Sequence, residues 1–215
     1  WRLDESVAGS GSHGDLNAHI IDLARYLVGD FDRVVGMKET FIKERPVSET
    51  GMDGKLSAIA TNKSVKGKVT VDDATLFLAR FGNGALGSFE ATRFAAGRKN
   101  HNRFEVNGAK GSIVFNLERM NELEYYNVDD PVGWQGFRVI QTTDSSHPYM
   151  QAWWPPAHII GYEHTFIHQV YELMQAIASG KQASPNFEDG LECQRVLEAV
   201  KWSIDEYEWV NIQDV

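Results

Sequence analysis

The sequence predicts an α+β domain in which one large, open-faced and predominantly antiparallel sheet carries helices on one face. Three observations predict this class: a helical segment opens the chain, a series of short strands joined by turns follows, and two long helices close it. Strands that succeed one another through turns rather than helices pair antiparallel. The 215 residues leave room for one large domain or two small ones, and the order of elements favours one.

Composition excludes several classes of protein. The chain is 42% hydrophobic and 24% charged, as is typical of globular proteins. Its net charge of −9 argues against nucleic acid or an anionic membrane as partner, because those surfaces need a basic footprint. No apolar run approaches the roughly 20 residues that span a bilayer. Cys193, the single cysteine, excludes an internal disulfide and favours a reducing compartment, so we expect a cytoplasmic protein.

The N-terminal residues WRLDESVAG show neither an initiator methionine nor the basic-then-apolar pattern of a signal peptide. We therefore expect the sequence to be a fragment of a longer chain.

The first helix is expected to begin at Gly14-Asp15 and to end before Gly29. Apolar residues recur in it with the i, i+4, i+7, i+11 spacing of one helical face. This face, which we expect to be buried, contains Leu16, Ile20, Leu23 and Leu27.

Strands come next. Residues 32–45 are expected to form a long strand that Pro46 ends, and the polar residues 46–70 a loop. Gly82-Asn83-Gly84 is a hairpin turn between two strand-like runs, because these residues tolerate positive φ. The strands expected from there on are 74–81, 85–94, 101–107, 111–116, 121–127 and 136–143.

The aromatic and proline-rich segment 148–164 is expected to be irregular, followed by helices over about 163–179 and 187–207 and a short edge strand within 208–212. The apolar positions expected to face inward on the two helices are Phe166, Ile167, Val170, Met174 and Ile177, and then Leu191, Val196, Leu197, Val200 and Ile204.

Asp15 and His19 are four residues apart, so their side chains neighbour each other on one helical face, and Asp22 continues the line. A carboxylate bonded to one imidazole nitrogen fixes the tautomer and raises the basicity of the other nitrogen. Such a histidine can take the proton of a substrate hydroxyl. The structural alternative is that Asp15 caps the helix, His19 is partly buried and Asp22 pairs with Arg25. Spacing alone favours this alternative.

Histidines also flank the aromatic loop. His164 and His168 have the i, i+4 spacing of a metal-binding pair, but the HExxH pattern and a cysteine cluster are absent, which favours a polar helix face. His158 and His164 are better candidates for substrate contact. Trp153 and Trp154 are suited to stacking on a sugar ring, although plain packing explains them equally well.

Other catalytic patterns are missing. GSGSHG precedes a helix but lacks the G-x-G-x-x-G spacing and a preceding strand, and neither a Walker pattern nor a G-x-S-x-G elbow occurs. Cys193 lies inside an amphipathic helix, so nucleophilic catalysis has little support.

Several segments resemble a known family. AGSGSHGDLNAHIIDLARYLVGD resembles the signature that opens the C-terminal domain of the Gfo/Idh/MocA oxidoreductases. FGNGALGSFEATR is similar to the family's central hairpin and FEVNGAKGSIVFN to its next strand pair. HIIGYEHTFIHQVYELMQAIASGK and PNFEDGLECQRVLEAV resemble its two closing helices. In this order they cover essentially the whole chain, which implies a single substrate-binding and oligomerisation domain over residues 1–215.

The resemblance implies an activity. The family contains NAD(P)-dependent dehydrogenases of sugars and cyclic polyols, whose D-x-x-x-H pair corresponds to Asp15 and His19. His19 would remove the hydroxyl proton as hydride leaves for the nicotinamide, and Asp15 would hold and tune it. Asp22 would support the helix. Arg93, in the hairpin segment, joins His158, Trp153, Trp154 and His164 as a substrate-binding candidate.

The resemblance also implies what is absent. The family's Rossmann domain, with its glycine fingerprint and the lysine of its E-K-P motif, does not occur in these residues. NAD or NADP would be bound mainly by that domain, so the chain alone is expected to be inactive. The open sheet face would mediate homodimer or homotetramer contacts.

Three hypotheses follow, in order of support. The first is this dehydrogenase half, acting on a sugar or cyclic polyol. The second is a non-catalytic binding or assembly module of dehydrogenase ancestry. The third is a metal-dependent isomerase or hydrolase that uses Asp15, His19, Glu163 and His164.

Overall fold

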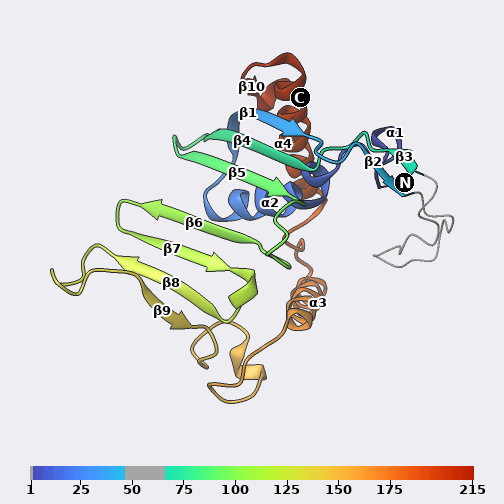
Figure 1. Cartoon of the computed structure of the whole chain (residues 1–215). Coiled ribbons are helices and arrows are strands. Elements are labelled where there is room, and N and C mark those ends of the chain that lie inside the picture. The colour runs from blue at the N-terminus through green and yellow to red at the C-terminus, as the bar shows by residue number, and fades with distance from the viewer. Residues whose placement is uncertain (1, 47–65) are drawn as a thin grey trace. The chain divides into compact units, whose positions relative to one another are not determined.

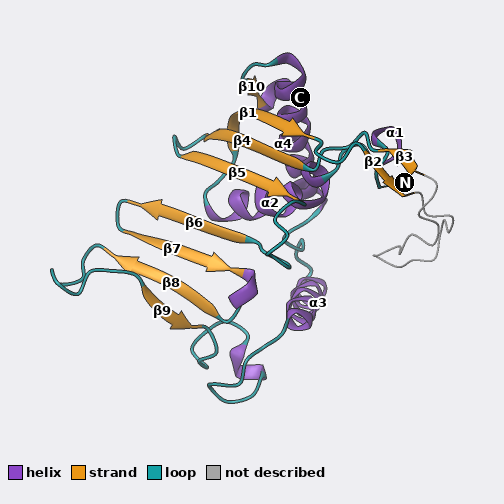
Figure 2. Ribbon diagram, viewed as in Figure 1, coloured by secondary structure: helices purple, strands orange, loops and turns teal. Residues whose placement is uncertain are grey.

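The computed structural model describes residues 2–46 and 66–215 and divides the chain into two units (Figure 1). The first unit comprises Trp1–Ala96 and Phe187–Val215, and the second comprises Gly97–Asn186. Helices and antiparallel sheets occur in both (Figure 2), so the predicted α+β class is confirmed. The longer strands are hydrogen-bonded into two four-stranded sheets, one in each unit, rather than into one. No helix in the described ranges is long and apolar enough to cross a membrane.

The sheet of the first unit has the strand order β10-β1-β4-β5, with every pair antiparallel. Its strands are β1 (Phe31–Glu39), β4 (Ala74–Phe81), β5 (Leu86–Thr92) and β10 (Val210–Asn211). The hairpin between β4 and β5 turns at Gly84, whose φ is +91°. The predicted edge strand is confirmed, because among the described strands β10 pairs with β1 alone. A separate two-stranded ladder joins β2 (Glu44–Pro46) to β3 (Lys66–Lys68). The rest of the predicted 46–70 loop lies mostly outside the described residues.

One face of this sheet forms the core of the unit. Along β4, Phe77, Ala79 and Phe81 are buried and their neighbours are exposed, the alternation expected of a sheet covered on one side. Helix α4 (Phe187–Glu206) packs against β1, and α2 (Ala18–Leu27) packs beside α4 (Figure 1). The approach is close at Gly36, where an added Cβ would lie 3.1 Å from Val200 Cγ1. The Gly36 N–H also donates to Ser203 Oγ of α4 at 3.0 Å.

The other face of the sheet carries apolar side chains that the described residues leave exposed, alongside polar residues of β4 and β5. Leu76 and Leu78 of β4 are 42% and 53% exposed, and Met37 of β1 is 66% exposed. Met37 pairs with Leu76 across the ladder, so these side chains share one face. Leu86 of β5, 70% exposed, pairs with Arg80 beside them. The sheet therefore has an open face, as expected.

The expected register of the first helix is wrong by one position. A π-helical turn, His13–Asn17, precedes α2, and the buried residues are His13, Asn17 and Ile21. The predicted core positions are only half-buried, and Leu27 is 37% exposed. A π-turn adds a residue to the helical repeat and so rotates every later side chain. The 3.6-residue pattern also counts His13 and Asn17 as surface residues because they are polar.

The sheet of the second unit has the order β6-β7-β8-β9 and is antiparallel throughout. Its strands are β6 (Arg103–Gly108), β7 (Gly111–Asn116), β8 (Glu122–Asn127) and β9 (Arg138–Gln141), all within predicted segments apart from single terminal residues. The first residue of β7 is Gly111. A larger residue would not fit there, because an added Cβ would lie 2.2 Å from the Tyr126 carbonyl oxygen. Short 3-10 helices, η2 (Leu117–Arg119) and η3 (Met150–Ala152), lie in this unit, and η4 (Ile212–Asp214) ends the first.

The two closing helices, α3 (Tyr162–Ser179) and α4, lie where the sequence predicts them. In α4, Val196, Leu197 and Val200 are buried as expected, whereas Leu191 is 52% exposed. In α3 no residue is buried, so its inward-facing assignment is wrong for this chain. The exposed α3 residues are Phe166, Ile167, Val170, Met174 and Ile177. Amphipathicity shows that a helix has an apolar face, but it does not show what covers that face.

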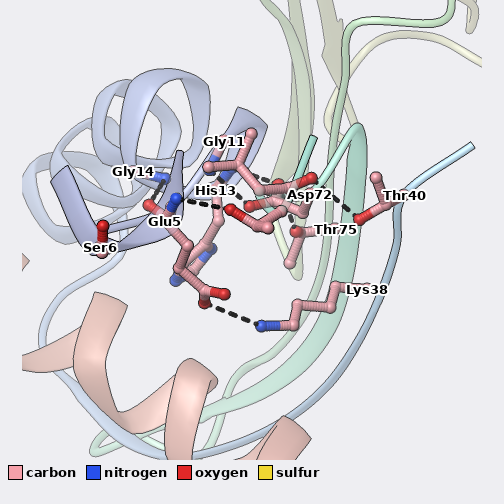
Figure 3. Close-up of polar contacts among 12 residues, drawn as sticks. Glu5, Ser6, Gly11, His13, Gly14, Lys38, Thr40, Asp72 and Thr75 are labelled. Atoms are coloured by element: carbon pink, nitrogen blue, oxygen red, sulfur yellow. Dashed lines mark hydrogen bonds and ion pairs between the residues drawn. The ribbon is translucent and has the colours of Figure 1, made fainter. Parts of the chain in front are cut away.

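A buried carboxylate anchors the segment between α1 (Glu5–Ala8) and the π-turn (Figure 3). Asp72, just before β4, is 3% exposed. Its Oδ1 accepts the Gly11 N–H at 2.6 Å, and its Oδ2 accepts the His13 N–H at 2.8 Å. The hydroxyls of Ser12 and Thr75 also donate to Oδ2. Gly11 is required at this contact, because an added Cβ would lie 1.9 Å from the Asp72 carbonyl oxygen.

Burial opposes the charged form of Asp72, but the hydrogen bonds from Ser12, Gly11, His13 and Thr75 outweigh it and lower the pKa of this carboxyl below its ordinary 3.8. Because the folded-state pKa is depressed, the carboxylate contributes stability above the ordinary value. That contribution is lost as the pH falls through the folded-state pKa.

Replacing Asp72 by Asn should therefore lower the free energy of unfolding by about 1–3 kcal/mol near neutral pH, because an amide nitrogen cannot accept the N–H and O–H groups that face it. The difference from wild type should shrink as the pH falls below about 4. Urea unfolding at a series of pH values measures both the loss of unfolding free energy and its dependence on pH. Asp30→Asn is the control, since that side chain is 82% exposed and its ion pair with Arg25 contributes little. A difference that stays constant into acid would contradict the assignment of stability to the ionised Asp72.

Candidate active site

Asp15 lies in the middle of the π-turn, on the side away from the core, and is held by Arg93. The Arg93 Nη2 donates to Asp15 Oδ2 at 2.9 Å and to the Gly11 carbonyl oxygen at 3.2 Å. Arg93 directly follows β5, so the sheet brings together two residues that are 78 positions apart. The Asp15 side chain is 52% exposed and that of Arg93 is 27% exposed. The pair is therefore accessible to a ligand and is fixed on its protein side.

A cavity of about 380 Å³ opens beside this pair. Arg93 and Asp15 line one part of it, and Glu198 and Lys201 of α4 line another. The cavity thus presents both cationic donors and anionic acceptors. A hydroxyl group donates one hydrogen bond and accepts others, so a mixed lining of this kind suits a neutral polyhydroxylated ligand better than a strongly charged one.

His19 stands in the first turn of α2 and is exposed to solvent. Within the ranges 2–46 and 66–215, its imidazole makes no hydrogen bond or ion pair, and it does not line the cavity. The expected bond from Asp15 to His19 is therefore not seen, because the Asp15 carboxylate binds Arg93 instead. His19 is left with both ring nitrogens available to a substrate.

The structural alternative for these residues is wrong at each point. Asp15 is inside the π-turn rather than at its N-cap, and His19 is not buried. Arg25 does not pair with Asp22, since its guanidinium binds Asp30 at 3.0 Å. Asp15 is therefore engaged by Arg93 rather than by a helix cap, and His19 is exposed without a hydrogen bond or ion pair to the described residues.

Three polar residues next to the site were missed by sequence reasoning: His13, Asn17 and Asp72, all of them buried. His13 Nδ1 is 3.0 Å from Asn17 Nδ2, and His13 Nε2 is 2.8 Å from the Leu197 carbonyl oxygen. Burial lowers the pKa of His13, so this imidazole is neutral near pH 7. One sequence signal could have identified His13 and Asn17: they have the same i, i+4 spacing as Asp15 and His19.

The remaining substrate-binding candidates belong to the second unit. Trp153 Nε1 donates to His168 Nε2 at 2.8 Å, and its ring meets His164 edge-on with centroids 4.5 Å apart. Trp153 and His164 thus pack in one aromatic cluster. Trp154 is 74% exposed, and its ring lies 5.8 Å from that of exposed His158. Trp154 and His158 form the accessible pair of the four.

Metal and nucleophile chemistry gain no support from the described residues. No group of three or more His, Cys, Asp or Glu side chains there is arranged to hold a metal ion. In the His164/His168 pair, His168 Nε2 accepts from Trp153, and His164 Nδ1 accepts the Gly161 N–H at 3.0 Å. Burial, and secondarily Asp22, raise the pKa of the Cys193 thiol, which keeps it protonated and unreactive.

Known proteins resemble the chain in sequence and in fold. Residues 1–114 match the model of the GFO/IDH/MocA C-terminal domain. Levoglucosan dehydrogenase of Pseudarthrobacter phenanthrenivorans is 43% identical over 216 residues, which cover 100% of this chain and 55% of that protein.

Solved structures give the same result. An oxidoreductase domain protein from Kribbella flavida is 51% identical with a TM-score of 0.89, over 99% of this chain and 54% of that one. Levoglucosan dehydrogenase in complex with NADH and L-sorbose is 42% identical with a TM-score of 0.88, over 99% of this chain and 52% of that one. The chain spans about half the length of these relatives. It belongs to the Gfo/Idh/MocA oxidoreductase family and corresponds to the C-terminal domain of that family.

Proposed function

We propose that this chain is the substrate-binding and catalytic-histidine half of an NAD(P)-dependent dehydrogenase that oxidises a hydroxyl of a sugar or cyclic polyol. The observation that carries the proposal is the pairing of Asp15 with Arg93, four residues before an exposed His19 that makes no hydrogen bond or ion pair with the described residues. The names of the relatives support it, since one is a levoglucosan dehydrogenase whose structure was solved with NADH.

His19 is the base of the proposed reaction. Its solvent-facing imidazole accepts the proton of the substrate hydroxyl when that carbon is oxidised, the task of a general base. Bound NAD or NADP supplies the hydride acceptor. Arg93 fixes Asp15 through one carboxylate oxygen, Oδ2, and leaves Oδ1 to accept a hydrogen bond from the substrate. Asp15 thus orients the ligand rather than tuning His19 directly.

The exposed side of α2 fits a cofactor and the domain that holds it. Leu16, Ile20 and Leu23 are only half-buried there, next to Asp15 and His19. A surface of this kind offers apolar contact to a flat ring and polar contact to a reacting hydroxyl. In the described ranges no strand leads through a glycine-rich turn into a helix, the arrangement that cradles a pyrophosphate. We therefore assign nucleotide binding to residues outside this chain.

A non-catalytic binding or assembly module remains the second candidate. It is favoured by one observation, that Asp15 binds Arg93 and not His19. The two candidates differ in the upstream sequence, which in the module would lack the glycine fingerprint or the lysine of the E-K-P motif. A dehydrogenase would carry both.

His19→Ala in the full-length protein tests the base. We expect kcat for NAD(P) reduction to fall by about 10²–10⁴-fold across a panel of levoglucosan, sugars and cyclic polyols. Thermal unfolding should not change, because His19 is exposed and unpartnered, and free imidazole should restore part of the rate. Asp22→Asn, an exposed change on the same helix, should leave kcat within about threefold. Normal turnover in His19→Ala would refute the assignment.

Trp154→Ala tests the accessible aromatic pair as a sugar contact. Loss of ring stacking should raise KM by about threefold to tenfold, equivalent to about 0.5–1.5 kcal/mol, with kcat unchanged. The matched control is Trp134→Ala, an 85% exposed tryptophan of the same unit. Equal KM values for the two variants would remove Trp154 from the binding site.

We also propose that a second copy of this chain covers the open face of the first unit's sheet, giving a homodimer or homotetramer. Its exposed leucines and Met37 support this, since uncovered apolar patches mark association surfaces. Light scattering measures the molecular mass of the full-length protein and of its Leu78→Glu variant, and the two masses are compared. A monomeric wild type, or a variant of unchanged mass, would contradict the proposal.

A further inference from the structure

Two side-chain pairs with the same spacing lie on opposite sides of the turn that carries the site. Asp15 and His19 face outward, while His13 and Asn17 face inward, with exposed fractions of 5% and 0%. Each buried residue precedes an outward-facing one by two positions. Any rotation of the turn that moved the buried pair would therefore move Asp15 by a similar amount.

The hydrogen bonds of His13 fix its tautomer. The Leu197 carbonyl oxygen can only accept, so the Nε2 atom 2.8 Å away carries the proton. The other nitrogen, Nδ1, then accepts from Asn17 Nδ2 at 3.0 Å. The backbone N–H of His13 donates to Asp72 Oδ2 at 2.8 Å. This one residue therefore joins the π-turn to α4 and to the segment before β4.

The His13–Asn17 pair has an energetic cost that two apolar residues in the same space would not have. Asn17 Oδ1 is fully buried without a hydrogen-bond partner among the described residues, which destabilises the fold. Two apolar residues would fill the space without this penalty. Local helical irregularity and unsatisfied buried groups are both concentrated at functional sites. The stability of the fold therefore does not explain why this turn contains His13 and Asn17. Their location next to the candidate site does.

We propose that His13 is a positioning residue that, through Asn17, Leu197 and Asp72, fixes the π-turn so that the Asp15 carboxylate meets Arg93 and the substrate. This inference rests on the proposed dehydrogenase function. His13 also lines the cavity, but both of its ring nitrogens are engaged by Leu197 and Asn17, so it acts through the backbone that carries Asp15.

The test replaces both partners in the full-length enzyme, as His13→Leu combined with Asn17→Leu. Apolar replacement of a hydrogen-bonded pair is close to neutral for stability, so the double variant should fold with an unfolding midpoint near that of wild type. We expect kcat to fall by about 10–100-fold, because small displacements of a catalytic group reduce turnover strongly. KM should change by less than about threefold. A stable double variant with wild-type kcat would show a merely structural role and overturn the proposal.

Two further variants keep the test decisive if the double variant fails to fold. His13→Gln retains a donor for the Leu197 carbonyl and should keep more of kcat than His13→Leu; equal losses in the two would contradict the proposal. Ser203→Ala is the control for general destabilisation, since it removes a part-buried α4–β1 hydrogen bond outside the site. It should lower the unfolding midpoint and leave kcat unchanged. A fall in its kcat equal to that of His13→Leu would refute positioning.

A readout that does not need turnover separates this inference from the proposed function. If the full-length wild type oxidises no sugar or polyol, the dehydrogenase assignment fails. Amide hydrogen exchange over residues 13–17, and a crystal structure of the double variant, still test the positioning. We expect faster exchange and loss of the 2.9 Å Asp15–Arg93 contact. An unchanged contact would refute it.

Discussion

The buried charge of Asp72 is the constraint on which the first unit depends. A carboxylate that is 3% exposed is tolerated only when its oxygens accept hydrogen bonds, and here two backbone N–H groups and two hydroxyls supply them. The segment before the helix therefore cannot shift without leaving the charge unsatisfied. Because the same segment leads into the π-turn, the direction of the helix that carries Asp15 and His19 is set by a residue of the sheet.

This anchor places the site where several elements meet. The end of β5 supplies Arg93, α4 supplies the Leu197 carbonyl, and the π-turn supplies Asp15. The polar groups on the buried side of the turn hold backbone, whereas Asp15 on its exposed side is held by Arg93 through Oδ2 alone. A site built in this way keeps its geometry through the packing of the sheet and α4, so its outward residues need few contacts with one another.

Local chemistry explains what the sequence predicted and what it did not. The β4–β5 hairpin and the bounds of α4 follow from nearby residues, the first from Gly84 and its neighbours and the second from a long helical period. The Asp15–Arg93 pair joins positions 78 apart, and no local pattern encodes such a contact. The buried face of α2 was misplaced because a π-turn breaks the 3.6-residue period. The apolar face of α3 was recognised, but periodicity does not tell whether the surface that covers it belongs to the same chain.

Apolar side chains of α2 lie both in the core, where Ile21 is buried, and on its exposed side. Buried polar residues, His13 and Asn17, lead into it, while Leu27 is 37% and Tyr26 is 86% exposed on its outer side. A helix that met water on that side would gain nothing from exposed leucine and tyrosine, whereas a helix between two layers of protein has apolar residues on both. Since the relatives are about twice as long as this chain, the second layer we infer is the half that binds the nucleotide. Under the proposed dehydrogenase function, the polar line of Asp15 and His19 would lie at the junction of the two halves, where a hydroxyl and a nicotinamide ring would meet.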